Sequence, residues 1–398
     1  MQLVDRTIED VILSLAKKYP VITITGPRQS GKTTIVNKIF PDKEYINLEN
    51  PDQREFAISD PRAFLKKIEE GAILDEIQRT PDIISYLQEI VDTKQIKGQF
   101  ILTGSNQFSL LNNVTQSLAG RTVLLKLLPF SIQELKTTIK NFNADDFLYF
   151  GFYPGIYKEK LNPTIAYRSY YETYIERDLR QLIQIKDLDL FQRFVRLCAG
   201  RIGQLFNASH LSNEVGVSVP TVKSWLSILQ ASYVVMNLQP YYENINKRLT
   251  KSSKLYFYDV GLASYLLGIE NPQQLSRDPL RGALFENMVL MELVKARNNS
   301  ALDHNLYFYR DSHQNEVDII FKSGSLIIPI EVKSAQTFNP YFLKGLNYLL
   351  KLFPDRMKTG YVVYDGQIEQ KVGQFDIVNF RKIDKVLKIQ NPSFELKF

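Results

Sequence analysis

The stretch Gly26-Pro27-Arg28-Gln29-Ser30-Gly31-Lys32-Thr33-Thr34 decides how the first part of this chain folds. It fits the pattern G-x-x-x-x-G-K-[ST], and it lies between an apolar, β-branched run (residues 20–25) and a segment that can start a helix (residues 33–40). In such a strand–loop–helix the glycines let backbone N–H groups point at phosphate oxygens, and the helix N-terminus adds its positive dipole end. Lys32 then reaches the β- and γ-phosphates, and the Thr33 hydroxyl ligates Mg²⁺. The stretch predicts a nucleoside triphosphate site.

The composition is that of an ordered globular protein. At 398 residues, with 44% hydrophobic and 23% charged residues, the chain can bury a sizeable core in two or three domains. A net charge of +6 is compatible with a nucleic-acid partner without proving one. Cys198 is the only cysteine, which excludes an intramolecular disulfide and a multi-cysteine zinc site. Without a signal peptide or a long apolar run, we expect a cytoplasmic protein with no membrane segment.

A second acidic motif follows the P-loop. Residues 71–76 form an apolar run that closes on Asp75 and Glu76, which is typical of a Walker B strand. Asp75 would hold Mg²⁺ through its water shell, and Glu76 would orient and polarise the attacking water. An apolar run ending in two acids is weak evidence by itself, but its place about forty residues after a P-loop makes it strong.

The next apolar strand, residues 99–103, is followed by polar residues. A side chain that senses the γ-phosphate belongs at the end of this strand, and Thr103, Ser105 and Asn106 are the candidates. Strands that alternate with helices predict a parallel sheet covered on both faces, with the ligand at the carboxyl ends of the strands.

Two arginines are candidates for an arginine finger, which neutralises charge in the transition state. Arg121 stands just before the strand at residues 122–127, and Arg177 lies on a later helix. A finger from a neighbouring copy would imply a homo-oligomer, although Arg121 could also act within its own chain. The alternative is a solvated loop arginine for Arg121 and a salt-bridged surface arginine for Arg177.

The order of these motifs resembles a prokaryotic family of AAA-type ATPases whose members carry a C-terminal domain of unknown function. The resemblance rests on Gly-Pro-Arg-Gln-Ser-Gly-Lys-Thr-Thr, Leu-Asp-Glu-Ile-Gln, Leu-Thr-Gly-Ser and Leu-Ala-Gly-Arg, and it covers essentially the whole chain. It implies that Lys32, Thr33, Asp75 and Glu76 bind ATP and Mg²⁺, and that Arg121 is the finger. We assign residues 1–133 to the AAA core and 134–186 to a helical lid.

The predicted lid is rich in aromatic residues. Tyr167, Tyr170, Tyr171 and Tyr174 follow the spacing i, i+3, i+4, i+7, which is that of a buried helix face. The alternative is a platform on which single-stranded bases stack.

Residues 187–275 read as a winged helix-turn-helix. Asn207 caps a helix that ends near Val215, Gly216 makes the turn, and Ser218 caps the next helix. Residues 233–238 and 254–258 would form the wing. Bound to DNA, the second helix would face the major groove with Ser218, Thr221, Lys223 and Ser224, and the wing would contact phosphates with Lys247, Arg248, Lys251 and Lys254. The alternative is a module that docks proteins.

Residues 276–398 contain a further set of acids on two predicted strands, residues 316–321 and 326–333. A turn centred on Ser323-Gly324 would set Asp318 opposite Pro329. The two-residue period of a strand then places four side chains on one face of the sheet. These side chains are Glu316, which would lie opposite Glu331, together with Asp318, Glu331 and Lys333.

This constellation resembles the PD-(D/E)XK nuclease superfamily, with Asp318 and Glu331-Val332-Lys333 on its motif. Asp318 and Glu331 would ligate Mg²⁺ or Mn²⁺, and Lys333 would position water or stabilise the transition state. Glu286 matches the helical glutamate that some members add. Val317 stands where the motif's name has proline, as in many members. The alternative is a scaffold in which the acids pair with Lys333 and other basic residues.

The sequence thus predicts an α/β protein with a P-loop AAA+ parallel sheet, a helical lid, a winged helix-turn-helix and a restriction-endonuclease-like C-terminal α/β domain. We expect an ATP-hydrolysing protein that acts on DNA, with a nuclease-like domain dependent on Mg²⁺ or Mn²⁺. There are two alternative functions. One is a regulatory ATPase whose C-terminal units bind proteins, and the other is a DNA-remodelling ATPase that does not cleave DNA.

Overall fold

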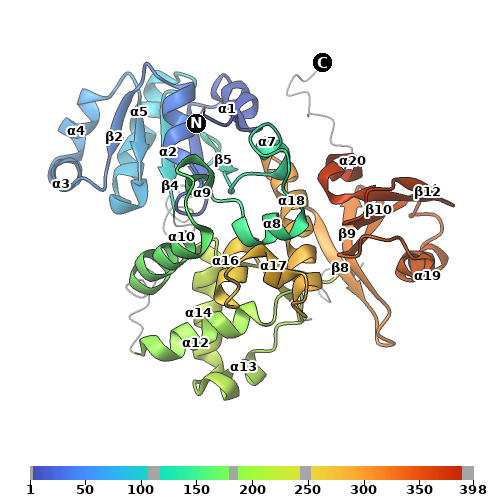
Figure 1. Cartoon of the computed structure of the whole chain (residues 1–398). Helices are drawn as coiled ribbons and strands as arrows, with labels where there is room; N and C mark the ends of the chain where they lie inside the picture. Colours follow the sequence, from blue (N-terminus) through green and yellow to red (C-terminus); the bar gives the residue numbers. More distant parts are fainter. Residues whose placement is uncertain (1–2, 106–116, 179–186, 243–251, 388–398) are drawn as a thin grey trace.

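The computed structural model describes residues 3–105, 117–178, 187–242 and 252–387. Asn106, Lys247, Arg248 and Lys251, and the side chain of Arg177, lie outside this description, so the roles predicted for them stay predictions. Figure 1 shows the nucleotide-binding unit beside a helical middle, with a second sheet on the far side of the long helix α18 (Arg281–Asn299). No helix in these ranges is both long and apolar enough to cross a membrane.

The first unit is built on a five-stranded sheet in the order β2-β3-β4-β1-β5, and every pair in it is parallel. This confirms the predicted α/β fold. The strands are β1 (Val21–Thr25), β2 (Glu44–Asn47), β3 (Ala72–Asp75), β4 (Phe100–Gly104) and β5 (Thr122–Lys126). Three of them, β1, β3 and β4, are buried along their whole length, because helices cover both faces of the sheet. The helices of this unit are α1 (Glu9–Ala16), α2 (Lys32–Ile39), α3 (Pro51–Ser59), α4 (Pro61–Lys67), η1 (Ile77–Arg79) and α5 (Ile83–Lys94).

The middle of the chain is helical and rich in buried tyrosines. Its first elements are α7 (Ile132–Leu135), α8 (Ala144–Phe150), α9 (Pro154–Lys158), α10 (Pro163–Tyr170) and the π-helix η2 (Tyr171–Asp178). All four tyrosines of the predicted helix face, Tyr167, Tyr170, Tyr171 and Tyr174, are buried in the core. The structure therefore confirms a packed interior and leaves these rings unavailable as a stacking platform.

The next elements are three helices and a hairpin, of which the last two helices and the hairpin are as predicted. They are α12 (Leu188–Ala199), α13 (Ala208–Val215), α14 (Val219–Ala231), β6 (Val235–Leu238) and β7 (Lys254–Phe257), followed by α16 (Val260–Leu266) and α17 (Pro272–Leu275). Asn207 and Ser218 accept hydrogen bonds from the first turns of α13 and α14, and Gly216 ends α13 in the left-handed conformation. These local signals confirm the helix boundaries.

The C-terminal unit holds a six-stranded mixed sheet in the order β12-β13-β11-β10-β9-β8. Its strands are β8 (Leu306–Arg310), β9 (Glu316–Ser323), β10 (Leu326–Lys333), β11 (Gly360–Tyr364), β12 (Gln370–Val372) and β13 (Phe375–Asn379). Besides α18, its helices are η3 (Pro340–Leu343), α19 (Lys344–Leu352), η4 (Phe380–Lys382) and α20 (Asp384–Leu387).

The predicted register of the β9–β10 hairpin was wrong by two residues. Ser323 pairs with Leu326 and Ile320 pairs with Pro329, because Gly324 (φ 60°) and Ser325 make the turn. Continuing this register sets Asp318, rather than Glu316, level with Glu331. Because the shift is even, the predicted face of the sheet is kept.

Gly151 joins three elements of the middle at one point. Its backbone (φ 60°, ψ −152°) lies in a region that only glycine adopts readily, and a Cβ there would overlap the Tyr167 hydroxyl and Asp259 Oδ1. Those two groups are bound to each other, with Tyr167 OH donating to Asp259 Oδ1 at 2.6 Å, so neither can move aside freely.

We predict that Gly151→Ala lowers the stability of the middle unit by about 3 kcal/mol, from backbone strain and overpacking together. The matched control is Gly216→Ala, where φ is also positive (87°) but a Cβ would meet nothing within 4 Å among the described residues. The control should cost only about 1 kcal/mol. Thermal unfolding followed by circular dichroism measures both, and equal shifts would contradict the packing argument.

Candidate functional site

The P-loop joins β1 to α2 through two glycines with positive φ. Gly26 (φ 152°) passes so close to the Leu127 carbonyl that any side chain would collide with it. Gly31 (φ 94°) occupies the N-cap position of α2 in the left-handed conformation. The loop therefore curls tightly and delivers Lys32 and Thr33 in the first turn of α2, as the sequence pattern predicts.

Lys32 is held inside the loop. Its ammonium donates to the carbonyl oxygens of Gly26 at 3.0 Å and Pro27 at 2.8 Å, and only 6% of the residue is exposed. Burial lowers the pKa of Lys32 to about 8, against the opposing charges of Glu76 and Asp75. A phosphate group beside the loop would offer this ammonium stronger acceptors than two neutral carbonyls.

Asp75 collects hydroxyl groups from three other elements. Its carboxylate accepts from Thr33 Oγ1 at 2.7 Å, from Tyr45 OH at 2.7 Å and from Thr103 Oγ1. Tyr45 was not predicted from the sequence, and only its place on β2, next to β3, could have signalled it. Burial and the Asp75 charge raise the pKa of Tyr45, so the phenol stays protonated and donates.

Glu76 directly follows β3 in the left-handed conformation (φ 57°). Its Oε2 accepts from Ser105 Oγ at 3.1 Å and from the amide of Gln78, which belongs to the Leu-Asp-Glu-Ile-Gln motif. Of the three sensor candidates, Thr103 therefore contacts Asp75 and Ser105 contacts Glu76. The carboxylates of Asp75 and Glu76 thus accept hydrogen bonds from different side chains.

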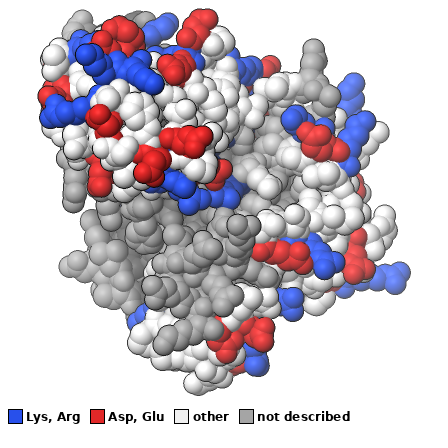
Figure 2. Space-filling view, turned by 90° about the vertical axis from the view of Figure 1, so that its left-hand side faces the viewer, with Lys and Arg blue, Asp and Glu red and all other residues white. Residues whose placement is uncertain are grey.

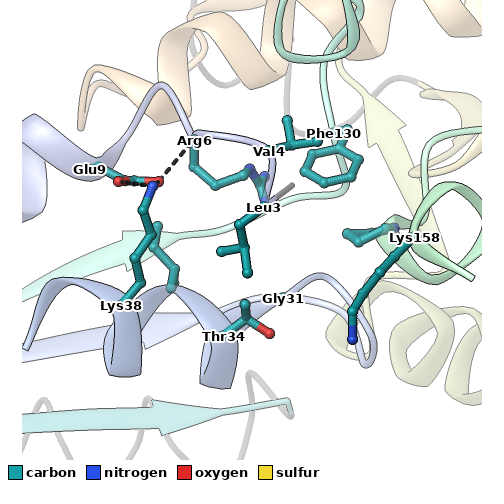
Figure 3. Close-up of a pocket in the computed structure, with 11 residues that line it drawn as sticks. Leu3, Val4, Arg6, Glu9, Gly31, Thr34, Lys38, Phe130 and Lys158 are labelled. Atoms are coloured by element: carbon teal, nitrogen blue, oxygen red, sulfur yellow. Dashed lines mark hydrogen bonds and ion pairs between the residues drawn. The ribbon is translucent and has the colours of Figure 1, made fainter. Parts of the chain in front are cut away.

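A hollow lies beside the P-loop on the side of the N-terminal segment (Figure 3). In this view Leu3 lies over Gly31 and Thr34, with Phe130 and Lys158 beyond it. The remaining lining residues are Val4, Arg6, Glu9, Ile35, Lys38 and Pro154. The Lys38 ammonium is paired with Glu9 and Asp5, so the polar rim of the hollow is ordered by ion pairs.

Arg121 is not brought to this site within one chain. Its carbonyl accepts from Val21 N at 3.2 Å, at the amino end of β1, whereas the P-loop follows the carboxyl end of that strand. Five residues of strand separate the two ends by about 15 Å. The Arg121 side chain is paired with Asp92 on α5.

The residues around the P-loop fit a Mg²⁺-nucleotide. The Lys32 ammonium, the Thr33 hydroxyl and the carboxylates of Asp75 and Glu76 lie at the carboxyl ends of β1 and β3, and the Thr33 hydroxyl already touches Asp75. Hard oxygen ligands of this kind suit Mg²⁺, which binds through one or two carboxylates and keeps its water.

The acids of the C-terminal face also come together. Asp318 Oδ2 accepts from Val332 N at 2.8 Å and from Lys333 Nζ at 3.2 Å, and the same ammonium lies 2.8 Å from Glu331 Oε2. Burial raises the pKa of Glu331 well above its usual value, and the charge of Asp318 adds to this effect. The hollow in front of them is bordered by Gln314, Asn315, Tyr341, Phe342, Lys344, Gly345 and Tyr348.

Lys254 does not lie where the predicted contact of the wing with DNA phosphates requires it. Instead of pointing to solvent, it is 3% exposed, and its ammonium lies 2.7 Å from Glu316 Oε1 and 3.3 Å from Glu286 Oε1. Tyr256 OH also donates to Glu286 Oε1, and burial raises the pKa of Glu286 to about 7. A phosphate contact by Lys254 is thus ruled out in this arrangement.

The acids of the C-terminal face are paired with lysines in this structure. The described part of the chain contains no group of three or more His, Cys, Asp or Glu side chains that could hold an ion. Lys333 takes the position between Asp318 and Glu331, and Lys254 takes that beside Glu286 and Glu316. The metal roles predicted for Glu286, Asp318 and Glu331 stay predictions.

The chain matches three described families along its length. Residues 18–136 match an AAA domain, and residues 141–273 and 281–383 match two domains of unknown function. An uncharacterized protein of Mycobacterium tuberculosis is 31% identical over 325 residues, which cover 80% of this chain and 71% of the relative. An uncharacterized protein of Methanocaldococcus jannaschii is 24% identical over 423 residues, covering 92% and 90%. The first unit is thus a P-loop ATPase domain of the AAA type.

Among solved structures, the chain is similar to a Walker-type ATPase of Pyrococcus abyssi. The sequence identity is 16% and the TM-score 0.45, over 67% of this chain and 96% of the other.

We predict that Arg121→Ala leaves ATP turnover unchanged where the chain is monomeric, because Arg121 lies at the opposite edge of the sheet from the P-loop. Phosphate release measures turnover, and Arg62→Ala, which removes another exposed ion-paired arginine, is the matched control. A loss at monomeric dilution would contradict the geometry. If the chain assembles, Arg121→Ala can be inactive in the assembly. Mixing it with Glu76→Gln would then restore turnover if Arg121 is a finger supplied by the neighbouring copy.

Proposed function

Because the chain belongs to the same family as its Mycobacterium tuberculosis relative and carries an AAA domain, we propose that it hydrolyses ATP at the P-loop to drive an action on DNA. One observation carries the ATPase part. Thr33 and Asp75 form a preassembled ligand pair, with Glu76 held separately by Gln78 and Ser105. Ligand oxygens and a water-activating carboxylate are the parts that hydrolysis of a γ-phosphate requires.

Each side chain then has a distinct task. The loop residues 26–34 cradle the phosphates with backbone N–H groups, and Lys32 neutralises their charge. Thr33 and Asp75 would hold Mg²⁺, which would draw charge from the phosphates. Glu76 orients the attacking water, and its carboxylate is held in place by hydrogen bonds from Gln78 and Ser105. The apolar hollow under Leu3 and Phe130 receives the base.

We predict that Glu76→Gln lowers ATP turnover about a hundred-fold or more while nucleotide still binds, because the amide fills the same space but cannot accept a proton. Lys32→Ala should lose binding itself. Phosphate release and isothermal titration calorimetry separate the two effects. The matched control is Glu70→Gln, an exposed glutamate paired with Lys94 away from the loop. Full turnover in Glu76→Gln would contradict the assignment.

DNA is the proposed substrate of the C-terminal units, with residues 187–275 acting as a winged helix-turn-helix. It is supported by the caps of α13 and α14 and by Ser218, Lys223 and Ser224, which are exposed on α14, with Thr221 half-buried beside them. Figure 2 shows basic and acidic side chains interspersed over the face that carries the nucleotide-binding unit. The charges on that face therefore give no reason to prefer it to α14 as the DNA-binding surface.

We predict that DNA stimulates ATP turnover, and that Lys223→Ala weakens DNA binding, as expected of a cation that faces the major groove. Fluorescence anisotropy at several salt concentrations measures the affinity, and Lys17→Ala on the nucleotide unit is the exposed-lysine control. Turnover indifferent to DNA would favour the regulatory rival, in which α14 docks a protein. DNA-stimulated turnover without nicking would favour the remodelling rival.

Phosphodiester cleavage by the C-terminal unit is the second candidate function. It is supported by Asp318, Glu331 and Lys333, which gather on one face of β9 and β10 around a hollow. Plasmid cleavage with Mg²⁺ or Mn²⁺ tests it, and cutting should be lost in Asp318→Ala but kept in Asp376→Ala on β13. No cutting by the native protein would leave these residues as an ion network that holds the units together.

A further inference from the structure

The strand that leads into the P-loop is attached to the helical middle by a buried hydrogen bond. Thr25 ends β1 directly before Gly26, and its hydroxyl lies 2.8 Å from the hydroxyl of Tyr233. Both residues are buried, at 2% and 1% exposure. The Thr25 hydroxyl also donates to the Leu125 carbonyl at 3.3 Å. Because neither hydroxyl can find a replacement partner in solvent, a movement of Thr25 strains its bond to Tyr233.

A second contact links the P-loop to the same place. The Arg28 guanidinium lies over the ring of Tyr174, 5.4 Å from its centroid, and Tyr174 OH donates to the Ser232 carbonyl at 3.3 Å. Tyr174 belongs to the π-helix η2, a rare element that is frequent at functional sites. The two sides of the loop, Thr25 and Arg28, therefore reach the consecutive residues Ser232 and Tyr233.

Backbone hydrogen bonds fix the Ser232–Tyr233 turn to α14. Ser232 N donates to Ile228 O at 2.9 Å, and Val234 N donates to Leu229 O at 2.8 Å. Tyr233 itself has φ 55°, an uncommon conformation for a tyrosine, and its ring packs against Tyr258 at 5.4 Å. The turn cannot shift without displacing the C-terminal end of α14.

Nucleotide binding changes the bonds next to this contact. Lys32 is bonded to the carbonyls of Gly26 and Pro27, which immediately follow Thr25. Phosphates that drew the ammonium toward themselves would release both carbonyls, and the backbone between Thr25 and Arg28 would then be free to relax. The contacts to Ser232 and Tyr233 lie at the two ends of that segment.

We propose that Tyr233 is a positioning residue that transmits the occupancy of the P-loop to α14 through its hydrogen bond with Thr25. This inference rests on the proposed binding of ATP and adds the route by which it reaches the DNA-facing helix. By reciprocity, a partner that binds α14 changes the affinity of the P-loop for nucleotide through the same bond.

Trp225 makes the coupling measurable. It is the only tryptophan in the chain, it lies on α14, and its ring packs against Phe191 at 5.3 Å and Phe194 at 5.5 Å. Its fluorescence therefore reports on α14 and on the packing of α14 against α12. We expect a non-hydrolysable ATP analogue with Mg²⁺ to change this emission in the native protein. Tyr233→Phe should bind the analogue by calorimetry with native affinity or nearly so, and should lose most of the emission change.

The matched control is Tyr149→Phe. Tyr149 is also buried, and its hydroxyl lies 2.9 Å from the Thr164 hydroxyl, away from the P-loop. This variant removes another hydroxyl–hydroxyl bond, one that is partly buried, and should keep the full emission change. Thr25→Val removes the other half of the Thr25–Tyr233 pair, and the double variant should lose no more signal than either single variant.

The outcomes separate this inference from the proposed function. No binding of the analogue to the native protein would overturn both. Binding without a change in Trp225 emission, or a full change in Tyr233→Phe, would overturn the coupling and leave ATP binding intact. A loss of signal in Tyr149→Phe as great as that in Tyr233→Phe would show general loosening of the middle, and would also overturn the specific role of Tyr233.

Discussion

Convergence on the carboxylate of Asp75 is the constraint on which the nucleotide site depends. Its donors come from α2, β2 and β4, so one buried acid at the end of β3 fixes the spacing of three neighbouring elements. An isolated buried carboxylate is costly, and each hydroxyl that it accepts lowers that cost. The same hydroxyls hold the acid ready for a metal ion, since a carboxylate with ordered donors loses little freedom on binding. Stability and function therefore require the same geometry here.

Much of this site could be predicted because its determinants are local. The glycines, Lys32 and Thr33 are set by a strand–loop–helix of a dozen residues, and Asp75 follows from the rule that polar residues after parallel strands meet at one edge. Applied to Arg121, the same rule would have given the right answer. Arg121 precedes its strand, so it belongs to the amino edge, where the structure places it. The role of Tyr45 could not be predicted from the sequence because it depends on which strand lies next to β3.

The C-terminal face shows where prediction from the sequence ends. The predicted register was wrong by two residues, but the predicted face of the sheet is kept because side chains alternate with a period of two. That face carries Glu316, Asp318, Glu331 and Lys333. The partner of Glu286 and Glu316 could not be foreseen, since Lys254 comes from a different unit. Its insertion gives each pair of acids an ammonium. Buried ion pairs of this kind contribute less to stability than their number suggests, and removing one partner leaves an uncompensated charge.

One short element touches both sites. The hairpin of β6 and β7 begins at the Tyr233 turn beside the P-loop, where Tyr258 N donates to Val234 O at 3.1 Å. Four paired positions later it ends with Leu238 opposite Lys254, whose ammonium lies among the acids of the C-terminal face. A paired ladder of this length spans about 13 Å and resists bending within its plane. The hairpin is buried along most of its length, so a displacement of Tyr233 cannot be absorbed by solvent-exposed backbone. If Tyr233 transmits nucleotide occupancy as proposed, the same hairpin would connect it with the ion pairs of Lys254, although about two hundred residues of sequence separate the P-loop from that hairpin.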